Sequence, residues 1–349
     1  MSPRHILSLG VLTLIALVLA LIVAAPDRPQ DDSPASELVP ALADQVNAIE
    51  RYRVHFPDGR DVITLFRAGQ RWRIEEYHGF EADFEAVADS LRLMAQSRRA
   101  SPRTSNPEWF SRLALNEPGA PDGAGMMVSF PELALPSLII GDLDPQGQGH
   151  FVRLAGDEQA WLADRRIDLP TRPIDWLQRS IMDIPASELV SVTILHPDGD
   201  QVRLRAADES GEDWVLMNVP EGRNAVAAWQ RRAPANGLSS LRLDDVAPAI
   251  DLPEASIRAL YATRDGLNVV ASLFRDESTP SDGGWLQFEV SAELDAVSPD
   301  DDEERHQRLL ADAAAVNQTL SAWRYKVDES RFSAMTPKLD RLLEPIEDD

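Results

Sequence analysis

The sequence predicts an α+β protein in which an N-terminal transmembrane helix is followed by three repeated antiparallel β-meander-plus-helix units. Three observations predict this architecture. A segment near the N-terminus is long, apolar and uncharged, an Asp-Gly turn between alternating apolar residues recurs three times, and apolar residues at helical spacing follow at least two of these hairpins. With 44% apolar and 26% charged residues, the 349-residue chain has the composition of a folded protein with a core.

Residues 1–25 are predicted to form a short cytoplasmic stub and the transmembrane anchor. Residues 6–25 carry no charge, and at about 1.5 Å per residue they span about 30 Å, the thickness of a bilayer core. Arg4 precedes this segment, so the positive-inside rule keeps the N-terminus in the cytoplasm and sends the body outward. The alternative is a signal peptide cleaved after Ala25, but the apolar segment is longer than usual and Pro26 fits poorly after a cleavage site.

The remaining chain is divided by composition and pattern. Residues 26–40 are rich in Pro, Asp and Ser and are predicted to be an extended tether. The three repeated units are residues 41–115, 185–250 and 251–349, and a β-hairpin-rich insert with a short helix, residues 116–184, separates the first unit from the second.

Each unit is predicted to contain a hairpin, because glycine after aspartate readily adopts the positive φ of a tight turn. The turns are Pro57-Asp58-Gly59, Pro197-Asp198-Gly199 and Arg264-Asp265-Gly266. A second strand follows each turn, at residues 62–66, 202–204 and 267–274, and a third strand begins with a tryptophan: Trp72, Trp214 or Trp285. The insert shows short strands at residues 127–130, 138–140, 151–154 and 160–163.

Helices are predicted to cover one face of the meanders. Residues 84–95 carry an apolar face that includes Phe84, Val87 and Leu91. Residues 309–323 form a similar face from Leu309 to Trp323, residues 224–232 show a shorter version, and residues 174–182 are predicted to be the short helix of the insert.

Charge and composition exclude several classes of function. The 34 basic and 58 acidic side chains give a net charge of −24, which argues against nucleic acid as a partner because a phosphate backbone needs a basic surface. The absence of cysteine excludes disulfides, thiolate nucleophiles and cysteine-based zinc sites. The chain also has no Gly-rich phosphate-binding loop, no nucleophile elbow and no H-E-x-x-H motif.

Several short motifs together resemble the bacterial domain of unknown function 4340 family, a DUF4340-type resemblance that extends over nearly the whole chain after residue 37. The motifs are Ser105-Asn106-Pro107, Leu113-Ala114-Leu115, Ile140-Gly141-Asp142, Phe151-Val152-Arg153 and Asp175-Trp176-Leu177. The resemblance implies a single-pass protein of the bacterial inner membrane with a periplasmic body. It also implies an accessory role beside gliding-type ABC exporters, with a permease and an auxiliary subunit as partners, and it supplies no catalytic residue.

Histidines offer the most specific candidate for a metal site. His55 and His196 occupy equivalent places just before two of the Asp-Gly turns, with Asp58 and Asp198 nearby as potential carboxylate ligands. The favoured interpretation is that both are polar ends of repeated strands, because equivalent positions in two units need not approach one another. We therefore assign no metal ligand from the sequence.

Two other stretches admit a functional interpretation. Residues 299–304 are acidic but lack the spacing of a calcium loop, so a solvated helix start is favoured. Gly147-Gln148-Gly149-His150 lacks a strand-to-helix setting and is predicted to be a hairpin loop.

Tryptophans and carboxylates are too numerous to mark a site by themselves. Trp72, Trp214 and Trp285 recur at one place in the unit and are expected in the core. A tryptophan outside this position that lies on the surface could bind a partner or a sugar. The tryptophans outside this position include Trp109, Trp161, Trp176 and Trp229. With 58 acidic residues, no pair stands out as catalytic.

The sequence thus favours a non-enzymatic, membrane-anchored accessory protein that binds partner proteins outside the cytoplasm, with no cofactor and no catalytic residue assigned. Two alternatives stay open. One is a ligand-binding module for a glycan or lipid, which predicts a concave apolar pocket with a few polar groups. The other is an acid/base hydrolase, which requires His55 and His196, or two carboxylates with shifted pKa, in one cleft.

Overall fold

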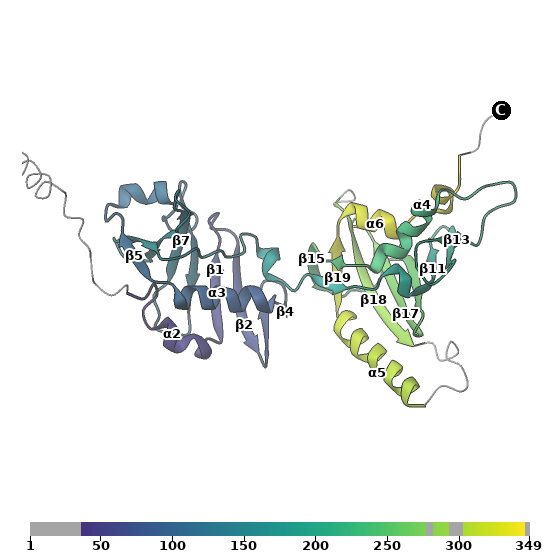
Figure 1. The fold of residues 1–349 in the computed structure, drawn as a ribbon, viewed down its shortest axis with the longest axis horizontal. Helices are drawn as coiled ribbons and strands as arrows, with labels where there is room; N and C mark the ends of the chain where they lie inside the picture. The colour runs from purple at the N-terminus through teal and green to yellow at the C-terminus, as the bar shows by residue number, and fades with distance from the viewer. Residues whose placement is uncertain (1–35, 277–281, 293–302, 346–349) are drawn as a thin grey trace, which may run out of the picture.

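The computed structural model describes residues 36–276, 282–292 and 303–345. Figure 1 shows two lobes, each built around one antiparallel sheet and joined by an extended segment, residues 164–179, which we call the linker. The predicted anchor and most of the predicted tether lie outside the described residues, and so do residues 299–302 of the acidic stretch. Among the described residues, no helix has both the length and the apolar character needed to cross a membrane.

The first lobe contains a nine-stranded sheet with the order β4-β3-β2-β1-β6-β7-β8-β9-β5. Its strands are β1 Arg51–His55, β2 Val62–Ala68, β3 Arg71–Ile74, β4 Phe80–Glu81, β5 Arg99–Pro102, β6 Met126–Ser129, β7 Leu138–Leu143, β8 His150–Leu154 and β9 Ala160–Ala163. Its helical segments are α2 Leu42–Gln45, η1 Val46–Ala48, α3 Phe84–Gln96 and η2 Pro107–Leu113.

The second lobe contains an eight-stranded sheet with the order β13-β12-β11-β16-β17-β18-β19-β15. Its strands are β11 Leu189–Leu195, β12 Gln201–Ala206, β13 Trp214–Leu216, β15 Asp245–Pro248, β16 Ile257–Thr263, β17 Leu267–Phe274, β18 Gly284–Ala292 and β19 Trp323–Val327. The helical segments are η3 Pro173–Trp176 in the linker and η4 Ala186–Glu188, α4 Ala228–Arg232, η5 Ala233–Leu238, α5 Glu303–Leu320, α6 Glu329–Met335 and η7 Leu339–Leu342 in the lobe. A small separate sheet pairs β10 Ser180–Met182 with β14 Leu241–Arg242.

The two sheets share one strand order. Apart from β4, the first sheet has the order β3-β2-β1-β6-β7-β8-β9-β5, and the second has the order β13-β12-β11-β16-β17-β18-β19-β15. Position by position, each strand of the first sheet corresponds to the strand of the second sheet whose number is ten higher. The joint in each is an antiparallel pair, β1 with β6 and β11 with β16. The unit that is repeated in the structure is therefore the lobe, which occurs twice.

The prediction of three repeated units is not confirmed. Strands of the first unit and of the insert form the first sheet, and strands of the second and third units form the second. The physical reason is that a three-stranded meander leaves an edge with unpaired N–H and C=O groups, and pairing two meanders edge to edge satisfies them. The broader prediction of an antiparallel α+β protein agrees with the structure.

Local predictions about hairpins are confirmed. The glycines of all three turns have positive φ, 69° at Gly59, 89° at Gly199 and 99° at Gly266, and the flanking strands pair in antiparallel register. In the first turn the Asp58 carboxylate accepts hydrogen bonds from the N–H groups of Arg60 and Asp61, both at 3.1 Å. The strands predicted for the insert correspond to β6, β7, β8 and β9.

The helix predictions need correction in three places. Residues 174–182 form a single 3-10 turn followed by β10, because Leu177 is extended and forms a bridge with Ala82. Trp323 begins β19 and does not belong to the helix. Phe84, expected on the apolar face of α3, is exposed, while Val87 and Leu91 are buried as predicted.

The lobes touch through aromatic rings at the end of the first sheet. Phe80 of β4 packs edge-to-face against Trp323 of β19, with ring centroids 5.0 Å apart, and lies 6.3 Å from Tyr325. The linker is held to the same strand, because the N–H of Gln178 donates to the carbonyl of Glu81 at 3.0 Å. These contacts bring the linker and the second sheet together at one polar cavity.

Candidate functional site

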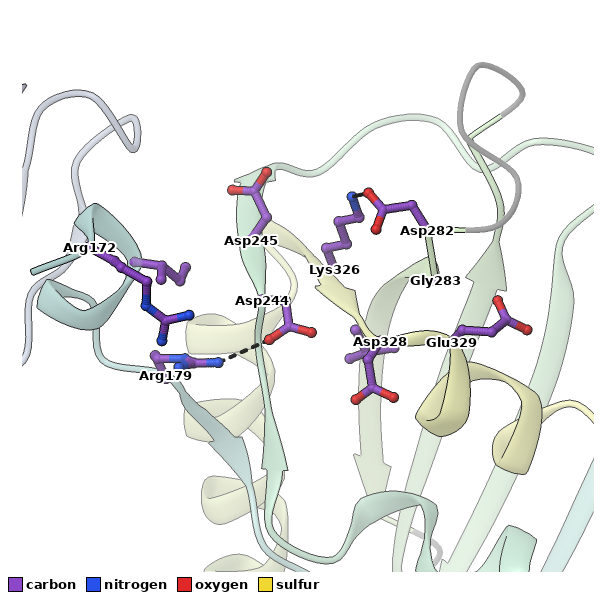
Figure 2. Close-up of a pocket in the computed structure, with 11 residues that line it drawn as sticks. Arg172, Arg179, Asp244, Asp245, Asp282, Gly283, Lys326, Asp328 and Glu329 are labelled. Atoms are coloured by element: carbon purple, nitrogen blue, oxygen red, sulfur yellow. Dashed lines mark hydrogen bonds and ion pairs between the residues drawn. The ribbon is translucent and has the colours of Figure 1, made fainter. Parts of the chain in front are cut away.

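A cavity of about 490 Å³ lies where the linker meets the second lobe (Figure 2). Its lining is polar and carries five carboxylates and three cationic side chains. The charged lining residues are Arg172, Arg179, Asp244, Asp245, Asp282, Lys326, Asp328 and Glu329. We call this cavity the interlobe cleft.

Backbone pairing positions these charges. Asp245 begins β15 and lies opposite Lys326 of β19 in the antiparallel register. The N–H of Leu243 donates to the carbonyl of Arg179 at 2.9 Å, which ties the linker to the segment that carries Asp244. Residues from the linker, from the end of the β15–β19 pair where Asp245 faces Lys326, from the segment before β18 and from the start of α6 therefore converge on one volume (Figure 2).

All three cationic side chains that line the interlobe cleft are already paired. Arg179 contacts Asp244 at 2.9 Å and Asp175 at 3.2 Å, and Lys326 contacts Asp282 at 2.5 Å. Arg172 binds both oxygens of Asp175 at 2.7 and 2.8 Å. The cationic groups are thus neutralised by neighbouring carboxylates.

Two carboxylates of the interlobe cleft have no ion pair among the residues that the structure describes, those of Asp245 and Asp328. Asp245 accepts a hydrogen bond from the N–H of Val246 at 2.8 Å. Its charge also helps to raise the pKa of Tyr77, after the larger effect of burial. Asp328 caps α6 by accepting from the N–H of Arg331 at 3.0 Å. The interlobe cleft therefore keeps an excess of negative charge after its internal pairs are formed.

Two acids of the interlobe cleft, Asp328 and Glu329, have a lowered pKa. Hydrogen bonds from Arg275 and Ser333 lower the pKa of Glu329 to about 2. The side chain of Ser330 and backbone N–H groups lower the pKa of Asp328 against the opposing effect of burial. A general acid needs a pKa near the working pH, so these two groups are suited to binding a cation and not to donating a proton.

The two histidines considered as an alternative metal or catalytic pair lie in different lobes. His55 ends β1 in the first lobe, and His196 follows β11 in the second (Figure 1). The Nε2 atom of His196 lies 3.1 Å from the carbonyl oxygen of Pro337, and Asp198 pairs with Lys338 at 2.5 Å. Within the described ranges no group of three or more His, Asp or Glu side chains is placed to hold a metal ion.

The other residues singled out in the sequence are a hairpin glycine and several tryptophans, most of which are buried. Gly147 turns between β7 and β8 with φ of 72°, as predicted for a hairpin loop. Trp72, Trp214 and Trp285 are buried, as expected. Of the freer tryptophans, Trp176 is also fully buried, whereas Trp109 and Trp229 are 51% and 73% exposed.

The motifs that carry the family resemblance meet in the first lobe. Arg153 of β8 donates to the carbonyl of Leu115 at 2.9 and 3.2 Å. A side chain at position 141 would meet the Leu113 carbonyl oxygen at 2.1 Å, so only glycine fits there. Asn106 caps η2 through the N–H of Glu108 at 3.1 Å. These motifs specify packing, and they lie apart from the interlobe cleft except for Asp175.

His150 provides a pH-dependent contact in the first lobe. Its Nδ1 accepts a hydrogen bond from the N–H of Ile167 at 2.9 Å. Burial lowers its pKa, Asp168 and Asp142 oppose this, and Arg166 adds to it. Because the pKa of His150 is lower in the folded chain than in the unfolded chain, the unfolded chain binds more protons below about pH 6.5. The contribution of neutral His150 to the free energy of unfolding is therefore complete above that pH and is lost as the pH falls through the folded pKa.

We therefore expect the free energy of unfolding to fall as the pH is lowered below about 6.5. His150→Asn keeps an acceptor for the N–H of Ile167 but does not titrate, so it should flatten this dependence. Urea unfolding at a series of pH values measures both slopes. Equal slopes for the parent and the variant would show that His150 does not carry the effect.

Sequence reasoning missed the interlobe cleft. Its charged groups come from residues 172–179, 244–245, 282 and 326–329, which are far apart in the chain. Only the pairing of β15 with β19 and of the linker with residue 243 brings them together. Among the predicted motifs, Asp175-Trp176-Leu177 was the single local signal close to this place.

Comparison with known proteins identifies one family. The family model described as "Domain of unknown function (DUF4340)" matches residues 72–259, more than half of the chain. This range runs from β3 to β16 and includes the linker and Asp244–Asp245 of the interlobe cleft. Neither the search of curated proteins nor that of solved structures gave a match.

Proposed function

Because the chain belongs to the DUF4340 family, a domain of unknown function, we propose that it is a non-enzymatic, membrane-anchored accessory protein that binds a basic segment of a partner protein in the interlobe cleft. The observation that carries the proposal is the charge of the cleft, where five carboxylates face three cations. Asp245 and Asp328 remain without an ion pair among the described residues and offer acceptors to an incoming Lys or Arg.

Three features of the molecule support binding over catalysis. The lowered pKa of Asp328 and Glu329 keeps these groups ionised at neutral pH. The net charge of −24 attracts a basic segment over a distance and speeds its association. The aromatic contact of Phe80 with Trp323 supports the junction, so that the cleft presents its charges in a defined arrangement.

The location of the protein is part of the same proposal. The uncharged residues 6–25 would anchor the chain in the bacterial inner membrane and place both lobes in the periplasm. There the partner would be a permease or an auxiliary subunit of an envelope ABC-transporter-like, gliding-type system, as the resemblance implies. The acid/base hydrolase has less support, since the described carboxylates of the cleft are poised for ionic contacts.

The test compares two variants that each remove one negative charge. Asp245→Asn keeps the acceptor for Val246 and the shape of the side chain, and Glu209→Gln makes the same charge change in the exposed turn before β13. Full-length protein is crosslinked in intact membranes, purified and analysed by mass spectrometry. We expect Asp245→Asn to reduce recovery of the partner about five- to tenfold, because it replaces a charge-assisted hydrogen bond by a neutral one, a difference of about 1 kcal/mol.

Glu209→Gln should recover the partner as the parent does. Replacing residues 1–25 by an unrelated anchor tells whether the membrane segment adds a contact of its own. Equal recovery with Asp245→Asn and Glu209→Gln, or no specific partner with the parent chain, would refute binding in the cleft.

A further inference from the structure

A second cavity lies in the second lobe, where β16, β17, β18, β19 and α6 contribute to its lining, and it differs in character from the interlobe cleft. It has a volume of about 690 Å³. Most of its lining is apolar, and two arginines and one aspartate interrupt it. The lining residues that matter here are Ile250, Ile257, Phe274, Trp285, Arg324 and Phe332. We call this cavity the Arg324 pocket.

Arg324 has no hydrogen-bond or ion-pair partner for its side chain among the described residues. Its guanidinium carbon lies 4.5 Å from the ring centroid of Trp285, and its Nε is buried without an acceptor. Arg231 and Arg232 also bury an unpaired Nε, but their terminal nitrogens contact Asp213 and Glu212. The other arginine of the pocket, Arg275, binds Glu329 through both terminal nitrogens at 2.6 and 2.8 Å.

Burial of a guanidinium N–H group without an acceptor destabilises the protein when no ligand is bound. A guanidinium has five N–H donors, and a buried donor without an acceptor loses its hydration without compensation. Stacking on Trp285 offsets part of this cost and fixes the plane of the guanidinium. A carboxylate matches that plane through two parallel hydrogen bonds and is the natural complement of an immobilised arginine.

The walls beside Arg324 would accept an acyl chain. Phe274 pairs with Trp285 across β17 and β18, and Ile257 begins the neighbouring strand β16. Ile250 is 42% exposed and is fixed at the rim by two hydrogen bonds with the side chain of Gln287, at 2.9 and 3.0 Å. A volume of about 690 Å³ lies within the range of cavities that bind small organic ligands.

We propose that the Arg324 pocket binds a long-chain fatty acid, with the carboxylate on Arg324 and the acyl chain against Phe274, Ile257 and Ile250. The positive charge of Arg275 is bound to Glu329, so Arg324 is the cation of the pocket that has no ion pair among the described residues. This pocket shares no lining residue with the interlobe cleft and adjoins it through the ion pair of Arg275 with Glu329, and the proposal does not depend on the partner of the cleft.

The test uses a palmitate analogue with a photoreactive diazirine in its acyl chain, applied to membranes that contain the full-length protein. After irradiation, peptide mapping should find the label on peptides that contain residues 250–257 or 273–276. Arg324→Gln should reduce this labelling about tenfold, the loss of one charge-assisted hydrogen-bonding group. Arg203→Gln, which changes an exposed arginine of β12 in the same way, should leave it unchanged.

Two further measurements keep the outcome decisive. The methyl ester of the same probe lacks the negative charge and should label the pocket weakly. Thermal unfolding of Arg324→Gln should match the parent, which separates loss of the ligand from loss of the fold. Equal labelling by the acid and the ester, equal labelling of Arg324→Gln and the parent, or labelling of other peptides only would overturn the proposal.

Discussion

Replacing Trp176 by alanine is expected to lower the free energy of unfolding by about 3–5 kcal/mol, the range for removing a large buried aromatic side chain. Trp176 is fully buried, its ring meets that of Tyr52 edge-to-face at 6.4 Å, and its Nε1 donates to the carbonyl of Pro170 at 3.1 Å. Its own carbonyl accepts from the N–H of Asp83, the cap of α3, at 2.8 Å. The side chain thus fastens the linker to the first lobe.

Urea unfolding measures this loss, with Trp229→Ala as the matched control. Trp229 is 73% exposed, so its removal should change the free energy of unfolding by less than about 0.5 kcal/mol. A Trp176→Ala protein as stable as the Trp229→Ala protein would show that the linker does not depend on this buried ring.

Replacing Arg153 by methionine is the second change with a large expected effect. Arg153 is only 6% exposed, donates twice to the carbonyl of Leu115, donates to the carbonyl of Asp157 at 2.9 Å and stacks over Phe110 at 4.6 Å. Methionine fills similar space but donates nothing. We expect a loss of about 2–4 kcal/mol, because a buried carbonyl without a donor costs about 1–3 kcal/mol and the cation–π contact adds about 1 kcal/mol.

Arg92→Met is the control for this substitution. Arg92 is an exposed residue of α3 whose side chain pairs with Asp89 one turn away, and such pairs contribute about 0.3–0.5 kcal/mol. Urea midpoints of the two variants should therefore differ clearly. If Arg153→Met unfolds at the midpoint of Arg92→Met, the hydrogen bonds to Leu115 do not hold this part of the first lobe.

Local structure was predictable where short-range chemistry determines it. The turns at Gly59, Gly199 and Gly266 follow from the need for positive φ after aspartate, and α3 follows from its apolar spacing and the cap at Asp83. The prediction of a helix over residues 174–182 was wrong. The apolar spacing of this segment is compatible with a helix, but in the folded chain Leu177 is extended and pairs with Ala82.

Long-range pairing was not predictable from the pattern. Nothing local in β1 or β11 indicates that their free edges pair with β6 and β16, so the joining of meanders into two lobes appears only in the structure. The interlobe cleft depends on this joining, because β15 supplies Asp245 and its partner β19 supplies Lys326. The motifs that identify the family, by contrast, are visible in the sequence because packing contacts such as Gly141 against Leu113 tolerate few residue types.

The central claim, that a partner occupies the interlobe cleft, has a direct chemical test because the chain contains no cysteine. Single cysteines are introduced as Asp245→Cys in the cleft and Glu209→Cys in the exposed turn, and a cysteine-to-lysine crosslinker is added to intact membranes. The proposal predicts a crosslinked permease or auxiliary subunit from position 245 and none from position 209, with the linked lysine in a basic segment. The same products from both positions, or none from position 245, would contradict it.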